Sequence, residues 1–139
     1  MVGTNNLGDG DGPEAIYAGI QAIVRQLRRL LPAADCFVIE IPPCGPEFSF
    51  NSAVRVRTNE LLHAACEFRS INVDEVITTG FSSDCRNYLA DRIHWSEEGY
   101  RVLTRHVVAA IAAGERRSSR TPQFNLPLSR RGQPSSPLR

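Results

Sequence analysis

Short apolar runs alternate with amphipathic segments along the first 113 residues of this chain. The short runs predict strands, and the segments with apolar residues at helical spacing predict helices. The predicted strands span residues 1–4, 36–41 and 74–79. The predicted helices follow them in turn, at residues 13–31, 52–68 and 97–113. Strands that alternate with helices pair in parallel through right-handed crossovers. The pattern therefore predicts an α/β fold built on a parallel sheet.

The first predicted helix carries the clearest signals. Pro13 suits a first helical position, and Pro32 ends the segment. Between them, apolar residues recur every three or four positions, at Ile16, Ile20, Ile23, Leu27 and Leu30. In the last predicted helix, one face holds Tyr100, Leu103, Val107 and Ile111. Both helices should place an apolar stripe on the sheet.

Charge divides the chain into two parts. Residues 1–114 hold ten arginines against 14 acidic residues, a net charge of −4, whereas residues 115–139 hold six arginines against one glutamate, a net charge of +5. The second part is rich in Arg, Ser and Pro, which predicts a disordered tail over residues 115–139. The 139-residue chain contains no lysine, which excludes Schiff-base chemistry, a phosphate-loop lysine and a Ser-Lys dyad.

The sequence predicts neither a membrane span nor a metal or other cofactor. No apolar run approaches the roughly 18 residues that a spanning helix needs. No signal peptide is visible, so we expect a cytoplasmic protein if Met1 is the genuine start. The acids at Asp9 and Asp11 do not form a calcium loop, because Glu14 occupies the position that requires glycine. The four cysteines form no C-x-x-C pair, which favours reduced, buried thiols over zinc ligands or disulfides.

Asp91 and His94 have the spacing of the second half of a catalytic triad. An aspartate three residues before a histidine can orient the imidazole and stabilise its protonated form. Asn5 follows the first predicted strand, and the Asp91–His94 loop follows the third. Because the carboxyl ends of parallel strands meet at one edge of a sheet, both motifs should lie there. The serines near the loop are Ser82, Ser83 and Ser96, none of them in a tight turn after a strand, and Ser96 suits a helix cap.

Two motifs resemble the third and fourth conserved blocks of the SGNH (GDSL-type) hydrolases. They are Gly3-Thr4-Asn5-Asn6 and Asp91-Arg92-Ile93-His94, the latter followed by Ser96-Glu97-Glu98-Gly99-Tyr100. The resemblance covers roughly residues 2–112 and implies a three-layer α/β/α, flavodoxin-like fold. The segment Arg57-Thr58-Asn59-Glu60-Leu61-Leu62 is similar to the branch that contains platelet-activating-factor acetylhydrolase subunits.

The resemblance implies a role for each matching residue. His94 corresponds to the general base, Asp91 to its orienting carboxylate and Asn5 to an oxyanion-hole donor. Gly3 corresponds to a glycine where a side chain would crowd the site. Asn6 stands where the family usually has aspartate, so the hydrogen bond made there is in question.

Three other residues near or outside these motifs have plainer readings. Trp95 stands where proline is common and would place a large aromatic ring at the rim, either as a lip for an acyl chain or as ordinary packing. His63 and His106 lie within predicted helices without an acid at suitable spacing. Both are predicted to be ordinary surface or boundary residues.

The first two blocks of the family, with the Gly-Asp-Ser nucleophile, have no counterpart here. Residues 1–114 are therefore expected to be the C-terminal part of an SGNH-type esterase domain, incomplete at its N-terminus. Such a fragment would be inactive alone towards a small-molecule or lipid-like ester. The alternative is a catalytically dead SGNH-like domain of a retroelement-type protein, which binds RNA through its arginine-rich tail or binds a protein partner. The oligomeric state stays open.

Overall fold

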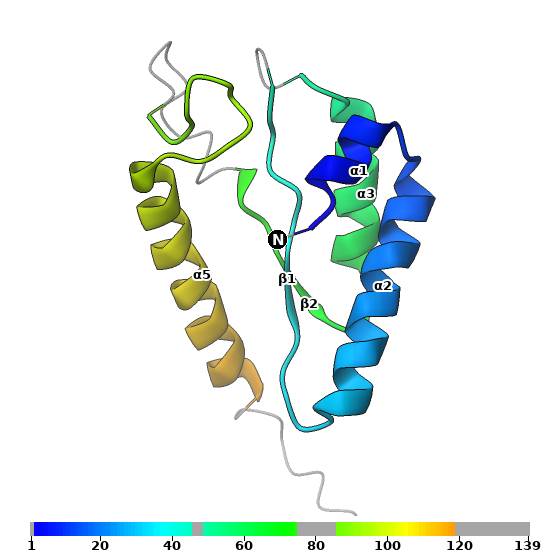
Figure 1. The fold of residues 1–139 in the computed structure, drawn as a ribbon. Coiled ribbons are helices and arrows are strands. Elements are labelled where there is room, and N and C mark those ends of the chain that lie inside the picture. Colours follow the sequence, from blue (N-terminus) through cyan, green and yellow to red (C-terminus); the bar gives the residue numbers. More distant parts are fainter. Residues whose placement is uncertain (1, 46–48, 75–85, 119–139) are drawn as a thin grey trace, which may run out of the picture.

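The computed structural model describes residues 2–45, 49–74 and 86–118. These residues form an α/β arrangement, as the alternating pattern predicted (Figure 1). In chain order the elements are α1 (Thr4–Asp9), α2 (Pro13–Leu30), β1 (Phe37–Ile39), α3 (Ser52–Ala64), β2 (Arg69–Ile71) and α5 (Glu97–Ser118). Among them, no helix is long and apolar enough to cross a membrane.

The two strands pair in parallel. Phe37 lies opposite Arg69 and Ile39 opposite Ile71. The Glu40 N–H continues the ladder by donating to the Ile71 carbonyl at 3.0 Å. The chain passes from β1 to β2 through α3, the connection that parallel strands require. Helices α2 and α3 lie on one side of the strands and α5 lies on the other (Figure 1), so the described residues form three layers.

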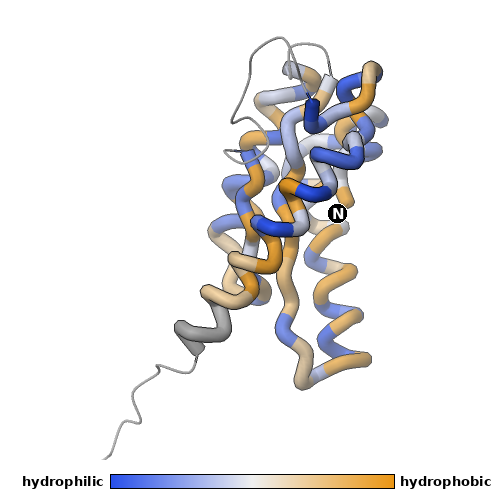
Figure 2. The backbone as a smooth tube through the Cα atoms, turned by 90° about the vertical axis from the view of Figure 1, so that its left-hand side faces the viewer, coloured by the Kyte–Doolittle hydropathy of each residue, from blue (hydrophilic) through white to orange (hydrophobic). Residues whose placement is uncertain are grey.

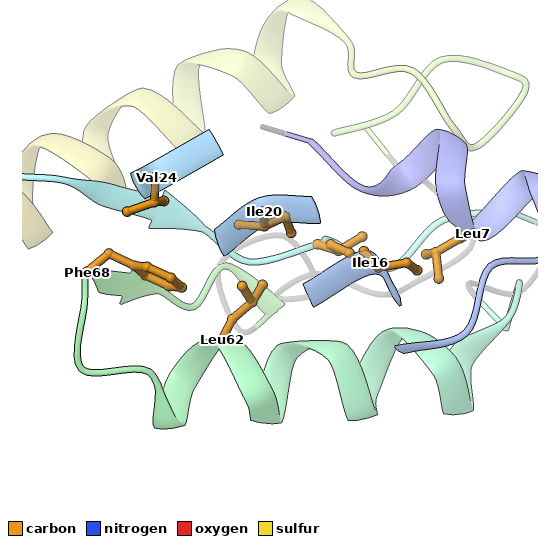
Figure 3. Close-up of a cluster of buried hydrophobic side chains, with 7 residues drawn as sticks. Leu7, Ile16, Ile20, Val24, Leu62 and Phe68 are labelled. Atoms are coloured by element: carbon orange, nitrogen blue, oxygen red, sulfur yellow. The ribbon is translucent and has the colours of Figure 1, made fainter. Parts of the chain in front are cut away.

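A hydrophobic cluster fills the space between the strands and the pair α2 and α3 (Figure 3). Its buried members are Leu7, Ile16, Ile20, Val24, Ile41, Leu62 and Phe68. Of the three from α2, Ile16 and Ile20 belong to the apolar stripe that the sequence predicted, and Val24 does not. Hydrophobic and hydrophilic residues alternate around the helical turns in Figure 2, as expected for helices with one face on a sheet.

A second cluster lies between the strands and α5. Its buried members are Ile71, Val73, Tyr88 and Trp95, and α5 adds Leu103, Val107 and Ile111. Alternate residues of the β1 segment face opposite clusters: Phe37 and Ile39 contact this one, and Cys36 and Val38 contact the first. The alternation explains why the apolar run has no polar face.

The predicted strand at residues 1–4 is wrong over its described residues. Val2 and Gly3 lie outside any strand, and Thr4 begins α1. Helix α1 continues to Asp9, and the chain leaves it at Gly10, which has a left-handed conformation with φ 83°. Burial of Leu7 explains the helix, because its side chain, 1 % exposed, joins the first cluster.

The third predicted strand, residues 74–79, is wrong at Asp74, the one residue of it that the structure describes. The chain forms β2 at Arg69–Ile71, whereas the sequence predicted a strand over residues 74–79, of which 75–79 lie outside the described residues. Helix α3 begins at Ser52 as predicted but ends at Ala64, four residues before the predicted end. Ala65 turns into an extended conformation, and Ile71 and Val73 then place two buried side chains against α5.

The cysteines differ from one another in burial. Cys36, Cys44 and Cys66 are free thiols. Cys44 is buried, and burial raises the pKa of its thiol. Cys66 is exposed and lies beyond the end of α3, so the prediction of a buried thiol on a helix is wrong there. Cys85 lies outside the described residues.

Helix α5 extends beyond its predicted end at residue 113. It continues to Ser118, into the segment predicted as tail. The remainder of that segment, residues 119–139, lies outside the described residues. The predicted boundary at residue 114 therefore falls inside a helix.

Candidate active site

Residues 86–96 form a loop that folds back on itself before α5. Tyr88 and Trp95 make an antiparallel bridge. The Leu89 N–H donates to the His94 carbonyl at 2.8 Å, and the Ser96 N–H donates to the Asn87 carbonyl at 3.0 Å. These contacts hold both ends of the loop together and leave the Asp91–His94 segment near its tip.

The loop is attached to the segment that follows β1. The Gly45 N–H donates to the Arg92 carbonyl at 2.8 Å, and the Tyr88 hydroxyl donates to the Pro43 carbonyl. The Tyr88 ring also packs edge-on against Trp95, with 6.1 Å between ring centroids. Because both aromatic rings are buried in the second cluster, the position of the loop is fixed by the core.

Asp91 binds His94 in two ways. Its Oδ2 lies 2.7 Å from His94 Nδ1. Its Oδ1 accepts the backbone N–H groups of Ile93 at 2.9 Å and of His94 at 3.0 Å. Because an ionised carboxylate only accepts hydrogen bonds, Nδ1 carries a proton in this pair, so the lone pair of the neutral ring is on Nε2.

The same contacts hold Asp91 in its ionised form. The hydrogen bond from His94, followed by those from the backbone N–H groups of Ile93 and His94, lowers the pKa of Asp91 from 3.8 to about 2. The carboxylate is therefore charged across the neutral range and can stabilise an imidazolium on His94. This is the electrostatic arrangement that a general-base histidine needs.

The pair is open to solvent. The His94 side chain is 75 % exposed and the Asp91 side chain 46 % exposed. In the part of the chain that the structure describes, no serine or cysteine side chain is hydrogen-bonded to the His94 ring. Ser82 and Ser83 lie outside that part.

Ser96 and Trp95 have structural roles. The Gly99 N–H donates to Ser96 Oγ at 3.1 Å, so Ser96 caps α5 as predicted. Trp95 is 6 % exposed and packs between Tyr88 and Tyr100, whose ring centroid lies 5.8 Å away. The expectation of an aromatic ring at the rim is therefore wrong, and the packing alternative holds.

Gly99 is a constraint that sequence reasoning did not identify. It is buried in the first turn of α5, and a Cβ at this position would overlap the Asn87 carbonyl group. Only glycine lets the loop approach the helix this closely. The signal available in the sequence was the glycine itself, within the first turn of a helix where glycine is otherwise unfavourable.

The Gly3–Asn6 motif forms the start of α1. Asn5 is exposed in the first turn. Gly3 precedes the helix with φ 109°, and a Cβ there would lie 2.5 Å from Ile41 Cδ1. The space that this glycine provides is therefore taken by the hydrophobic core. The Asn6 side chain donates to Asp11 Oδ2 at 2.8 Å, so asparagine does make a local hydrogen bond here.

Helix α1 and the loop at residues 86–96 lie in the same half of the molecule. In Figure 1 both occupy the upper half, toward which the chain runs as it leaves β1. The structure places Asn5 there on a helix instead of directly after a strand.

The two remaining histidines are not equivalent. His106 Nε2 lies 2.7 Å from the Asn72 carbonyl oxygen, a contact between α5 and the end of β2. His63 Nδ1 lies 3.5 Å from Oε1 of the buried Glu40. His63 lies at the surface as predicted, with its side chain 78 % exposed, and the acid near it comes from another element, 23 positions earlier in the chain.

Comparison with known families matches residues 1–102 to the GDSL-like lipase/acylhydrolase family. No curated protein matches the chain. One similar solved structure, from Streptococcus pneumonia and described as a candidate platelet activating factor, has 21% sequence identity and a TM-score of 0.58. The match covers 79% of this chain and 56% of that one.

Two other structures share the fold. The esterase domain of the ZfL2-1 ORF1 protein from a zebrafish retrotransposon is 22% identical with a TM-score of 0.57, and the match covers 81% of this chain and 70% of that domain. A carbohydrate esterase family 3 protein from Talaromyces cellulolyticus is 18% identical with a TM-score of 0.60, covering 81% of this chain and 55% of that one. The chain thus spans little more than half the length of two of these three structures.

The sequence motifs, the three layers and the family comparison agree. The predicted likeness to SGNH (GDSL-type) hydrolases and the predicted α/β fold are both confirmed. Since the family match extends over residues 1–102, well over half of the 139 residues, this chain belongs to the GDSL-like lipase/acylhydrolase family.

Proposed function

We propose that the chain supplies the base, the orienting carboxylate and an oxyanion donor to a centre that hydrolyses carboxylic esters. His94 is the base, Asp91 the orienting carboxylate and Asn5 the donor. The nucleophilic serine comes from a segment other than this chain. The substrate is a small-molecule or lipid-like ester, and the chain alone has no esterase activity.

The observation that carries the proposal is the Asp91–His94 pair. The 2.7 Å contact leaves the proton on Nδ1 and the lone pair on Nε2. The carboxylate is charged at neutral pH, since its pKa lies at about 2. Membership of a lipase/acylhydrolase family gives this pair a reaction of the right kind.

The proposed reaction proceeds in two proton transfers through His94. Nε2 takes the proton of a serine hydroxyl as its oxygen bonds to the ester carbonyl carbon, and Asp91 stabilises the resulting imidazolium. The Asn5 amide donates a hydrogen bond to the oxyanion that forms. The imidazolium then returns the proton to the leaving alcohol oxygen as the ester bond breaks. Water repeats the sequence and releases the acid.

The test joins this chain to a Gly-Asp-Ser-containing strand–helix–strand segment of the family and measures hydrolysis of p-nitrophenyl acetate. We expect His94→Ala to lower kcat by about 10⁶-fold, as loss of a triad base does. Asp91→Asn should cost about 10⁴-fold, and Asn5→Ala about 10² to 10³-fold. His106→Ala is the matched control and should leave the rate unchanged.

The chain without the added segment provides the second arm. It should release p-nitrophenolate no faster than its His94→Ala variant does. Turnover by the chain alone that depends on His94 would contradict the external serine. Equal rates for the His94→Ala and His106→Ala variants of the joined protein would contradict the assignment of the base.

Two observations favour a second candidate function. The chain shares its fold with the esterase domain of a retrotransposon ORF1 protein, and six of its arginines lie in residues 115–139. In this alternative the domain is catalytically dead and its tail binds RNA. Retention on single-stranded RNA should then fall steeply with salt, and removal of residues 119–139, which leaves α5 whole and removes four of these six arginines, should weaken it. Salt-independent retention, or none, would exclude this function.

A further inference from the structure

A cavity of about 440 Å³ lies against α3, away from the Asp91–His94 loop. Its walls come from α3 and from the residues that follow β1 and β2. The polar side chains that matter here are Glu40, Arg55, Asn59, His63, Asn72 and Asp74. None of the lining residues belongs to the loop at residues 86–96 or to α1. The volume is within the range of small-molecule sites.

Glu40 is the unusual residue of this cavity. Its side chain is 2 % exposed, and its Oε2 accepts a hydrogen bond from Asn72 Nδ2 at 2.8 Å. Its Oε1 is buried and has no hydrogen-bond partner in the structure. His63 Nδ1, which is charged only when the ring is protonated, lies 3.5 Å from Oε1, too far for a normal hydrogen bond. A buried carboxylate with one neutral donor requires a further, preferably cationic, donor.

Most of the other polar groups of the cavity have partners, and Glu60 Oε2 accepts a hydrogen bond from Arg57 Nη1 at 2.9 Å, whereas the buried Arg55 Nε has none. Arg55 Nη1 donates to both carboxylate oxygens of Asp74, at 2.9 and 2.8 Å, and to the Ile41 carbonyl at 3.1 Å. The Asn59 side chain binds the Ile41 backbone N–H and carbonyl, each at 2.9 Å. Arg55 is thus paired with Asp74, and Glu40 Oε1 is left without a hydrogen-bond partner.

His63 covers Glu40 and does not form a second catalytic centre with it. Ser70 Oγ lies 3.3 Å from His63 Nδ1, the same nitrogen that faces Glu40. A serine–histidine–carboxylate relay needs the two partners on opposite ring nitrogens. The His63 side chain is 78 % exposed, so its ring can turn aside and uncover Glu40 Oε1.

We propose that this cavity binds a small organic ammonium ion through Glu40. The ammonium N–H groups donate to Oε1, in the place that the His63 ring takes in the structure. A metal ion is a poor fit, because the described residues include no group of three or more metal-ligating side chains. The site contains none of the residues proposed for ester hydrolysis. Each proposal can therefore fail without affecting the other.

The test is a titration of the full 139-residue chain with butylammonium, followed by NMR chemical shifts of His63 and Asn72. We expect millimolar binding that is at least tenfold tighter than binding of 1-butanol, which has the same shape but no charge. Tetramethylammonium, a cation without N–H donors, should also bind at least tenfold more weakly. Equal binding of the three probes, or none of butylammonium, would overturn the proposal.

Variants then assign the site to Glu40. Glu40→Gln keeps the size of the side chain and should weaken butylammonium at least tenfold. Glu14→Gln, in the exposed first turn of α2, should have no effect; an equal loss in both variants would mean non-specific charge attraction. His63→Ala removes the ring that faces Glu40 Oε1. It tests the binding of butylammonium at this site even if Glu40→Gln does not fold. It should bind butylammonium as well as the native chain or better, and a tenfold loss would contradict the assignment.

Discussion

Asp91 is an acceptor of three hydrogen bonds within four residues. The D-x-x-H spacing predicted its contact with His94, because the geometry of a short loop is local. The two further bonds from the backbone also follow from that spacing, since an aspartate side chain readily binds N–H groups two and three residues later. Local sequence thus determines most of this pair. The Glu40 and His63 contact was not predictable in the same way, because it depends on how β1 and α3 pack.

The titration of Asp91 gives a first prediction. Its folded-state pKa of about 2 lies below the ordinary value of 3.8. The stabilisation is therefore present above about pH 4 and is lost as the pH falls towards 2. A carbon-13 NMR titration of the Asp91 carboxyl should have its midpoint near pH 2, and His94→Ala should raise it. His106→Ala should leave it unchanged, and a native midpoint near 3.8 would contradict the structure.

Long amphipathic helices and short buried strands differ in how well the sequence predicts them. Helix α2 has five apolar residues in register and a proline at its start, and its observed range, Pro13–Leu30, matches the prediction closely. Strand β2 has three residues, two of them polar. Its position depends on pairing with β1 and on burial of Ile71 and Val73 under α5, which a local pattern does not contain.

The junction between the loop and α5 depends on Gly99. Gly99→Ala should lower the melting temperature, because the new Cβ would meet the Asn87 carbonyl, a backbone group with little freedom to move. We expect a loss of about 1–3 kcal/mol in the free energy of unfolding. Gly19→Ala is the matched control: it lies in α2 with open space around it, and alanine should add up to about 1 kcal/mol there. Equal effects of both changes would contradict the packing of the loop on the helix.

At the scale of the whole molecule, the described residues place two hydrophobic clusters on opposite faces of a short sheet. The family resemblance predicted this layering, whereas the exact members of each cluster depend on tertiary packing. The apolar stripe predicted for α2 shows how far the sequence can predict burial. Ile16 and Ile20 are buried, but Ile23 and Leu30 are 50 % and 66 % exposed. Helical periodicity gives the direction of a face, and the neighbouring elements decide how much of it is covered.

Leu62 tests the first cluster. It is fully buried between α3 and the strands, and Leu62→Ala should cost about 2–5 kcal/mol of unfolding free energy. Leu89→Ala, at a leucine that is 51 % exposed in the loop, should cost well under half as much. Urea unfolding followed by circular dichroism measures both. Similar losses would mean that the cluster does not hold the molecule together.

The tautomer of His94 tests most directly the claim that Asp91 orients His94 as a general base. It can be measured on the 139-residue chain without any added segment. A nitrogen-15 NMR spectrum that correlates ring protons with ring nitrogens, recorded where the imidazole is neutral, identifies the protonated nitrogen. The Asp91 contact predicts the proton on Nδ1 and the lone pair on Nε2, and Asp91→Ala should remove this preference. A neutral His94 with its proton on Nε2 in the native chain could not accept a proton from a serine there, and would contradict the assignment of His94 as the base.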